Sequence, residues 1–208
     1  MATSRTTTKP SARERLLAAA DELFYAEGVR SVGIDRVIEH AGVAKASLYN
    51  TFGGKEQLIR AYLDSRHAGI TQRITDAVDS RDTPRERLLA VFEAQGALFG
   101  EPGFHGCAFV RAGAEAGPGS LVEEAADNHR AWLRELFTRL AGEAGAADPR
   151  SLGRQLHLLY DGAGISARMD RDPSAAVAAR AAASALIAAG TGDVGRTGPA
   201  VTVAGALG

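Results

Sequence analysis

One short stretch of the sequence gathers side chains that can bond the phosphates and base edges of nucleic acid. It reads AGVAKASLYNTFGGKEQLI over residues 41–59. Lys45 can reach a phosphate or a guanine edge, and Asn50 can pair with adenine or bond a phosphate. The phenol of Tyr49 suits a phosphate oxygen. The apolar residues of the same stretch keep helical spacing, so these polar groups are expected on the outer side of a helix.

Two short helices joined by a tight turn are expected to position this polar set. The apolar residues of 34–41 form one helix face, and Gly42 ends that helix because a sharp turn requires a positive φ. A second helix follows over 43–52, with Leu48 on its inner side. Two helices in this arrangement form a helix-turn-helix. The second helix is short enough to lie in a DNA major groove about 12 Å wide.

Basic residues flank the two helices on both sides. After Gly53-Gly54 a new helix begins at Lys55, whose ammonium group and free backbone N–H groups can hold a phosphate. Residues 1–16 carry one carboxylate and four cations, on a chain whose net charge is −1. The cations are Arg5, Lys9, Arg13 and Arg15. The alternative is a helical corner with exposed polar residues and a solvated tail, but the arm and Lys55 together favour a nucleic-acid interface.

The remainder of the chain also shows helical spacing, and strand signals are scarce. Ser11 with Glu14 matches a capping box that opens a helix ending near Gly28. A long helix is expected from Lys55 to about Val78. An Asp-Pro pair opens each of the last two expected helices. The further helices are expected over 84–99, 107–117, 120–145, 148–170 and 172–190. The sequence thus predicts an all-α fold of about nine helices.

Residues 16–59 closely resemble the DNA-binding domain of the TetR family of bacterial transcription regulators, and the motif AGVAKASLYNTFGGKEQL carries the resemblance. The resemblance implies a homodimer that binds a palindromic double-stranded DNA operator, represses transcription and is released by a small effector. With it, the expected segments are a flexible basic arm (1–10), a three-helix helix-turn-helix domain (11–54), a helical ligand-binding and dimerisation domain (55–190) and, from its glycine-rich aperiodic sequence, a disordered tail (191–208). The positions that match the family's DNA-facing residues are Lys45, Ser47, Tyr49, Asn50, Thr51 and Lys55. The other candidate DNA contacts are Arg13, Ser31 and Gly33.

The chain departs from the family's pattern at the start of the first helix of the helix-turn-helix. Gly33 stands where the family usually has Thr or Ser, whose hydroxyl caps the helix and bonds a phosphate. Ser31 or the backbone N–H of Gly33 is expected to substitute for that hydroxyl. Ala44 and Ala46 offer only methyl contacts to thymine, so the basic arm and the shape of the DNA are expected to contribute more to recognition.

The second half of the chain is expected to hold a ligand pocket and a dimer interface. The pocket candidates favour a small apolar effector. They are Phe92, Phe99, Phe104, Phe109, Trp132, His129, Tyr160 and Asp161. The interface candidates lie on the last two helices, where small residues permit close helix approach. They are Leu152, Leu156, Leu159, Val177, Ala181, Ala185 and Leu186. Packing within one subunit is the alternative for both sets.

The sequence argues against an enzyme. His105 and Cys107 lie two residues apart in a loop without a third orienting group, and a cysteine is usually just a small buried apolar residue. The chain has no glycine-rich phosphate loop and no Cys/His metal-ligand spacing, so neither a cofactor nor a metal is expected. The remaining alternative is a nonspecific or architectural DNA-binding protein. That class would need a more basic chain and would not need a large apolar second domain.

Cysteine content and hydropathy predict a cytoplasmic protein without a membrane partner. A single cysteine excludes an internal disulfide framework and fits a reducing compartment. No apolar run reaches the roughly 18 residues that a membrane span needs. Residues 1–15 lack the apolar segment of a secretory signal.

Overall fold

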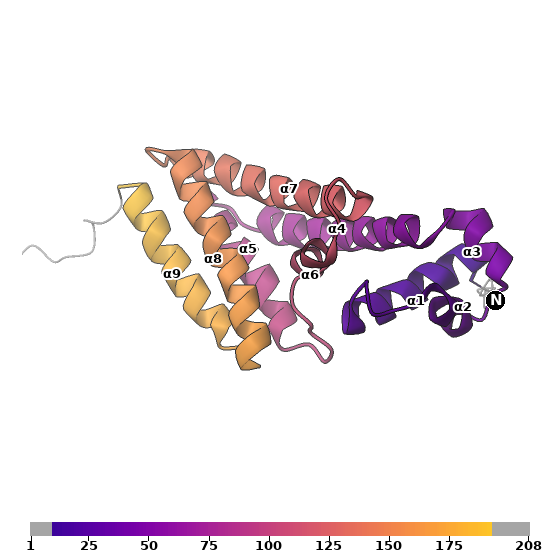
Figure 1. Ribbon diagram of the computed structural model, residues 1–208. Helices are drawn as coiled ribbons and strands as arrows, with labels where there is room; N and C mark the ends of the chain where they lie inside the picture. The colour runs from indigo at the N-terminus through magenta and orange to yellow at the C-terminus, as the bar shows by residue number, and fades with distance from the viewer. Residues whose placement is uncertain (1–9, 193–208) are drawn as a thin grey trace, which may run out of the picture.

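All regular secondary structure in the described part of the chain, residues 10–192, is helical (Figure 1). The computed structural model has nine helices in this range, so the prediction of an all-α fold is confirmed. In chain order they are α1 (Ala12–Glu27), α2 (Ile34–Ala41), α3 (Lys45–Phe52), α4 (Lys55–Asp79), α5 (Pro84–Phe99), α6 (Ala108–Glu115), α7 (Leu121–Glu143), α8 (Pro149–Asp170) and α9 (Ala175–Gly190). The expected flexible arm through residue 9 and the expected disordered tail from residue 193 lie outside the described residues.

The first three helices form a group at one end of the molecule, and α4 leads from this group to the other helices (Figure 1). The predicted capping box opens α1. The backbone N–H of Glu14 donates to the Ser11 hydroxyl at 3.2 Å, and the Ser11 N–H donates to the Glu14 carboxylate at 2.7 Å. Leu16, Phe24 and Leu48 are buried between these helices. Burial of such a side chain stabilises the fold by about 1.5–3 kcal/mol, so this core fixes α3 relative to α1.

The core beneath α1–α3 also contains residues of three later helices. Leu58 and Tyr62 come from α4, Phe109 from α6 and Val122 from the start of α7. Tyr62 meets Phe24 edge to face, with ring centroids 5.8 Å apart. The first three helices are therefore packed on the second half of the chain through α4 and α6. One core therefore extends across the boundary predicted between residues 54 and 55. The division of the chain into domains at that point stays a prediction.

A second core lies among α4, α5, α7, α8 and α9. Phe92, Phe137 and Tyr160 pack together there, with ring centroids 5.7–6.1 Å apart. Gly153 allows α8 to approach α7 closely, because a β-carbon at that position would lie 2.9 Å from the backbone nitrogen of Thr138. In Figure 1, α7 runs beside α4, and α9 runs beside α8. Within residues 10–192, no helix has the length and hydropathy needed to cross a membrane.

Two helices begin later than the sequence predicted. Helix α3 begins at Lys45 rather than Val43, because the Val43 N–H still donates to the Ile38 carbonyl in the turn. The predicted Asp cap of α8 is present, since the Asp148 side chain accepts a hydrogen bond from the Ser151 N–H at 3.0 Å. The same motif at α9 does not cap: the carboxylate of residue 172 accepts from the N–H and the hydroxyl of residue 174 instead. That turn delays α9 until Ala175.

Candidate nucleic-acid interface and adjoining cavity

The turn between α2 and α3 has the geometry that its glycine predicted. Gly42 has φ 60° and ψ 43°, in the left-handed region that favours glycine. Its N–H donates to the Glu39 carbonyl at 3.0 Å. Arg15 of α1 supports the turn from outside, with its Nη1 donating to the carbonyls of Ala41 at 3.3 Å and Gly42 at 2.9 Å. Sequence reasoning placed Arg15 only in the basic arm and did not find this structural role, which depends on how α1 meets the turn.

Helix α3 buries one side and exposes the polar side that the sequence predicted. Leu48 is fully buried, whereas Tyr49 is 47% exposed and Asn50 and Thr51 are also exposed. Ser47 is half-buried, and its carbonyl accepts a hydrogen bond from the Thr51 hydroxyl at 2.6 Å. Of these candidate contacts, Ser47, Tyr49 and Asn50 have side chains that the described residues leave without a hydrogen bond. They are therefore available to a partner.

Three cations lie at the ends of α1, α3 and α4. The Lys45 ammonium group pairs with Asp35 at 2.8 Å, and this hydrogen bond and charge raise the pKa of Lys45. Both groups are exposed, so the pair is weak enough to exchange for a phosphate contact. The Arg13 guanidinium lies 5.6 Å from the centroid of the Phe52 ring. Lys55 is half-buried at the first position of α4, where the cap residue Gly54 offers no side chain. The backbone N–H groups there remain open to an anion.

The start of α2 lacks a side-chain cap. Gly33 occupies the cap position with φ −74° and ψ 154°, and no side chain bonds the first turn. Ser31 is exposed, and its hydroxyl does not replace the missing cap. Whether the Ser31 hydroxyl or the backbone N–H of Gly33 bonds a phosphate stays a prediction, since both lie on the exposed surface. A β-carbon on Gly33 would meet no atom within 4 Å, so a larger residue fits this position.

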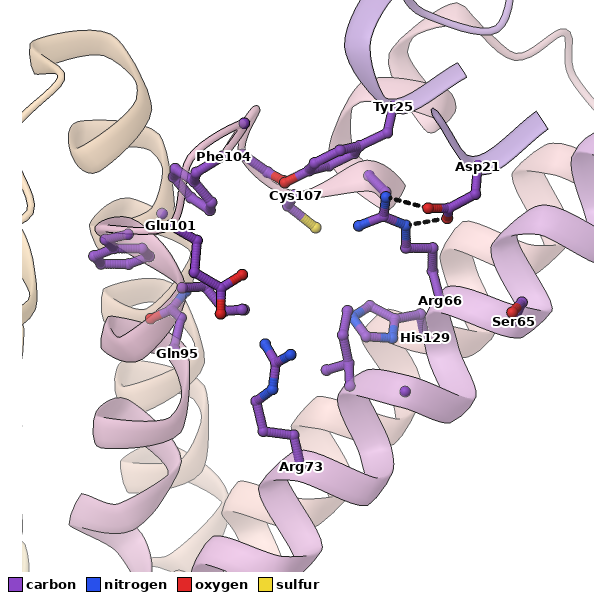
Figure 2. A pocket seen from close by; sticks show the side chains of 18 of the residues that line it. Asp21, Tyr25, Ser65, Arg66, Arg73, Gln95, Glu101, Phe104, Cys107 and His129 are labelled. Carbon is purple, nitrogen blue, oxygen red and sulfur yellow. Dashed lines mark hydrogen bonds and ion pairs between the residues drawn. The ribbon is translucent and has the colours of Figure 1, made fainter. Parts of the chain in front are cut away.

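A cavity of about 530 Å³ lies where α1, α4, α5, α7 and α8 meet the loop between α5 and α6. Figure 2 shows the side chains that surround it. Its volume suits a small-molecule ligand, for which pockets of about 300–1,000 Å³ are typical. The wall includes Asp21 and Tyr25, which belong to α1. The cavity is thus in direct contact with the same helix that supports α3.

The structure places half of the predicted pocket residues at this cavity. Those in the wall are Phe99, Phe104, His129 and Tyr160. The other predicted residues lie elsewhere, because they pack against neighbouring helices. Phe92 lies in the second core, Trp132 packs edge-on against His67, and Asp161 pairs with Arg130 at 2.9 Å. Phe109 stacks on His129 at a centroid distance of 3.7 Å, behind the wall. These four assignments to the pocket are corrected.

His129 is buried and neutral. Burial, and next the neighbouring His67, lower the pKa of His129 to about 3. The Nδ1 atoms of the two imidazoles are 3.0 Å apart, so one ring donates a hydrogen bond to the other. The pair joins α4 to α7 next to the cavity.

The cavity also contains charged and amide groups that sequence reasoning missed. They are Asp21, Arg66, Arg73, Gln95 and Glu101. Arg66 and Arg73 are seven residues apart on α4, which places both on one face of the helix. That spacing was a usable signal only for their shared side of α4, where Arg66 is half-buried and Arg73 is exposed. The positions of the acidic and amide groups carried no comparable signal.

Comparison with known proteins agrees with this architecture. A sequence profile of bacterial regulatory proteins of the tetR family matches residues 16–62, which include α2, α3 and most of α1. The crystal structure of SCO4454, a TetR-family transcriptional regulator from Streptomyces coelicolor, is 37% identical to this chain with a TM-score of 0.83. The match covers 86% of this chain and 96% of that one. This chain belongs to the TetR family.

Curated relatives support regulation of transcription rather than catalysis for this TetR-family chain. The HTH-type transcriptional regulator LmrA of Bacillus subtilis is 37% identical over 79 residues, which are 38% of this chain and 42% of LmrA. The HTH-type transcriptional repressor NemR of Escherichia coli is 32% identical over 110 residues, which are 52% of this chain and 55% of NemR. The chain thus matches about half the length of these relatives. Both are named as regulators, and neither is named as an enzyme.

The Cys107 thiol of this TetR-family chain is not activated as a nucleophile. The residue is exposed to the cavity, but the surrounding protein raises the pKa of the thiol by burial. A raised pKa keeps the sulfur protonated. The His105 ring packs edge to face on Tyr25, with centroids 5.4 Å apart, and forms no hydrogen bond to the sulfur. In the described range, no group of three His, Cys, Asp or Glu side chains could hold a metal ion.

An exposed apolar face covers α8 and the start of α9. Leu158 is 65% exposed, Ile165 48%, Met169 75% and Val177 73%. Such residues are unusual together on the surface of a monomer and are typical of an interaction site. Positions 158, 165 and 169 share one helical face because they are seven and four residues apart.

The predicted interface residues divide between this face and the core. Val177, Ala181 and Ala185 are exposed, and Leu159 and Leu186 are half-buried. The structure buries the other two within the subunit: Leu152 is 3% exposed and Leu156 is fully buried, both in the second core. These two are corrected as interface residues, because they lie on the opposite side of α8 from Leu158.

Proposed function

We propose that this chain is a ligand-responsive transcription regulator that binds a palindromic DNA operator as a dimer and leaves it when a small molecule enters the cavity. One observation carries the proposal, which is that α1 takes part in both sites. Near its first turn Arg13 lies over Phe52 of α3, and near its last turn Tyr25 lines the cavity. A ligand that displaces the last turn of α1 therefore also displaces the support of α3.

The contacts of α1 at the cavity are specific enough to transmit such a change. The Tyr25 hydroxyl donates to the Gly106 carbonyl at 2.9 Å and accepts from the His105 N–H at 3.1 Å. Arg66 of α4 lies 3.8 Å from the centroid of the Tyr25 ring and forms two hydrogen bonds to Asp21, at 2.5 and 2.8 Å (Figure 2). These groups form part of the cavity wall, so a ligand that fills the cavity competes with them for space.

Helix α6 holds the same end of α1 from a second direction. The Arg111 guanidinium donates to the carbonyls of Tyr25 at 2.9 Å and Ala26 at 3.2 Å, where a cation also complements the helix dipole. Glu115 of α6 accepts from the Arg30 N–H at 2.8 Å, just before α2. Because α6 follows the loop that closes the cavity, movement of that loop reaches both α1 and the segment before α2.

A dimer converts this local change into release of DNA. The exposed apolar face of α8 and α9 supports a symmetric interface, in which each subunit uses the same patch. Two α3 helices then lie in successive major grooves, about 34 Å apart. Release requires a ligand that binds better to the conformation in which this spacing is changed. We propose repression as the direction of regulation, which the name of NemR supports.

Selection of bound duplexes from a random library tests the DNA-binding part of the proposal. The full chain would be used at near-physiological salt, and the recovered duplex would be titrated by fluorescence anisotropy. A palindrome with half-sites about one helical turn apart is the expected result. Binding that has no sequence preference and vanishes as the salt concentration rises would overturn it in favour of a nonspecific or architectural DNA-binding protein.

A pair of asparagine variants makes the test specific to α3. Asn50 is exposed on α3, and Asn128 is exposed on α7. Asn50→Ala is expected to weaken binding to the palindrome at least about fivefold, because a two-bond contact to adenine contributes about 1–3 kcal/mol of discrimination in each half-site. Asn128→Ala is the matched control and is expected to bind as the parent chain does. Equal affinities of the two variants would mean that α3 does not read the DNA through Asn50.

A further inference from the structure

Two arginines on one face of α4 meet the cavity in different ways (Figure 2). Arg66 is already paired with Asp21 and stacked on Tyr25. Figure 2 shows that Arg73, about two helical turns further along α4, points into the cavity. Among residues 10–192, Arg73 has neither an ion pair nor a hydrogen bond. One cation of the wall is therefore satisfied by the protein, and the other is left for a ligand.

A carboxylate faces Arg73 from the other side of the cavity. Glu101 follows α5, and its side chain is directed toward Arg73 in Figure 2, but no ion pair joins the two. Beside them the Gln95 amide N–H donates to the Tyr160 carbonyl at 2.9 Å, so the Gln95 oxygen is left to accept a hydrogen bond. The polar part of the cavity thus offers a ligand one cation, Arg73, and two hydrogen-bond acceptors, the Glu101 carboxylate and the Gln95 oxygen.

The remaining wall is apolar and largely aromatic. Phe99 and Phe104 pack together with ring centroids 5.2 Å apart, and Ile70 and Leu98 add aliphatic surface. A flat ligand can pack against an aromatic wall of this kind. The planar guanidinium of Arg73 matches the two oxygens of a carboxylate. Arg73 is itself exposed to solvent, and it differs from an arginine on an open helix surface because it lines a cavity together with these apolar residues.

Resting on the proposed function, we propose that the effector is a small aromatic acid whose carboxylate pairs with Arg73 while its ring packs against Phe99 and Phe104. Glu101 accepts a hydrogen bond from a hydroxyl or amino group where the acid carries one. A neutral ligand of the same shape forms no charge-assisted hydrogen bonds with Arg73, so it binds more weakly. A cationic ligand is repelled by the same guanidinium.

Matched probes test the charge preference directly. Isothermal titration calorimetry of the full chain would use benzoate, 2-naphthoate and 2-anthroate, each with its amide and its aminomethyl analogue. At least one acid is expected to bind about tenfold or more tightly than its amide, and its amine is expected to bind weakest. Arg73→Gln is expected to remove the preference for the acid, and Arg73→Glu to reverse it toward the amine. Arg154→Gln, at an exposed position of α8, is the matched control.

The outcomes separate this inference from the proposed function. It is overturned if no acid binds, if an amide or amine binds as tightly as its acid, or if Arg73→Gln keeps the preference. Release of the selected operator would be measured separately by anisotropy. Release by neutral or cationic compounds alone would overturn the inference and leave the regulator intact. Acids that bind through Arg73 and never release DNA would support the inference and contradict ligand-controlled release.

Discussion

Truncation of Leu158 is expected to weaken a dimer built on α8 and α9. Leu158→Ala removes three carbon groups, each contributing about 0.8 kcal/mol when buried. The residue is 65% exposed in the single subunit, so an interface that covers it adds about 1.6 kcal/mol per copy. Both copies contribute in a symmetric dimer, giving about 3 kcal/mol, or roughly a hundredfold rise in the dissociation constant.

Sedimentation equilibrium over a range of protein concentrations would measure that constant. Val110→Ala is the matched control, because Val110 is 38% exposed on α6, away from α8 and α9. Circular dichroism would verify that both variants keep the helical fold, as expected for changes at exposed positions. The interface is misplaced if Leu158→Ala dissociates no more readily than Val110→Ala. A parent chain that stays monomeric at every concentration would also refute the interface.

Three further changes test the DNA-facing end and the histidine pair. Gly33→Thr adds the missing cap of α2. It is expected to raise the free energy of unfolding by a few tenths of a kcal/mol and to tighten operator binding. Urea unfolding and anisotropy titrations that are both unchanged would contradict this. Lys55→Ala is expected to reduce the slope of log affinity against log salt by about two, because each subunit of the dimer loses one phosphate contact, and an unchanged slope means that Lys55 contacts no phosphate. His129 has a pKa of about 3 when folded, whereas its unfolded pKa is about 6.5, so the unfolded chain takes up the proton first as pH falls. The free energy of unfolding is therefore expected to fall by up to about 1.4 kcal/mol per pH unit below pH 6.5. Urea titrations at several pH values would measure this slope, and His129→Gln is expected to make it smaller. An equal slope in the variant would show that another group titrates.

Local signals explain why the helix-turn-helix could be predicted from sequence. The capping box of Ser11 and Glu14 and the left-handed Gly42 are determined by residues within one turn of themselves. The predicted start of α9 was wrong because of another local interaction. An Asp-Pro pair favours a helix start, but the carboxylate of Asp172 bonds Ser174 and forms a turn instead. The helix cap and the turn both use the Asp172 carboxylate, and the sequence pattern does not show which of the two forms.

The cavity could be predicted only in part, because its wall is assembled from distant segments. An aromatic residue is equally typical of a core and of a pocket. Residue type therefore did not show that Phe104 lines the cavity whereas Phe92 lies in the second core. The pairing of Asp21 with Arg66 joins positions 45 residues apart. Helix α8 shows the same limit, since both of its sides are apolar. Which side faces the core depends on α7 and α9, and Leu156 rather than Leu158 turned out to be buried.

The separation of Arg73 from Arg66 makes ligand length decisive for release. Seven residues of helix span about 10.5 Å, which exceeds the length of a single aromatic ring with its carboxylate. A one-ring acid held at Arg73 therefore leaves the Arg66–Asp21 pair and Tyr25 undisturbed, whereas a longer acid reaches them. From Tyr25 the effect travels along α1 to Arg13, twelve residues or about 18 Å away, beside α3. Benzoate is thus expected to bind without releasing the operator, and longer acids to release it in anisotropy titrations. Release by benzoate at saturation equal to that by 2-anthroate would show that the signal does not pass through Tyr25 and α1.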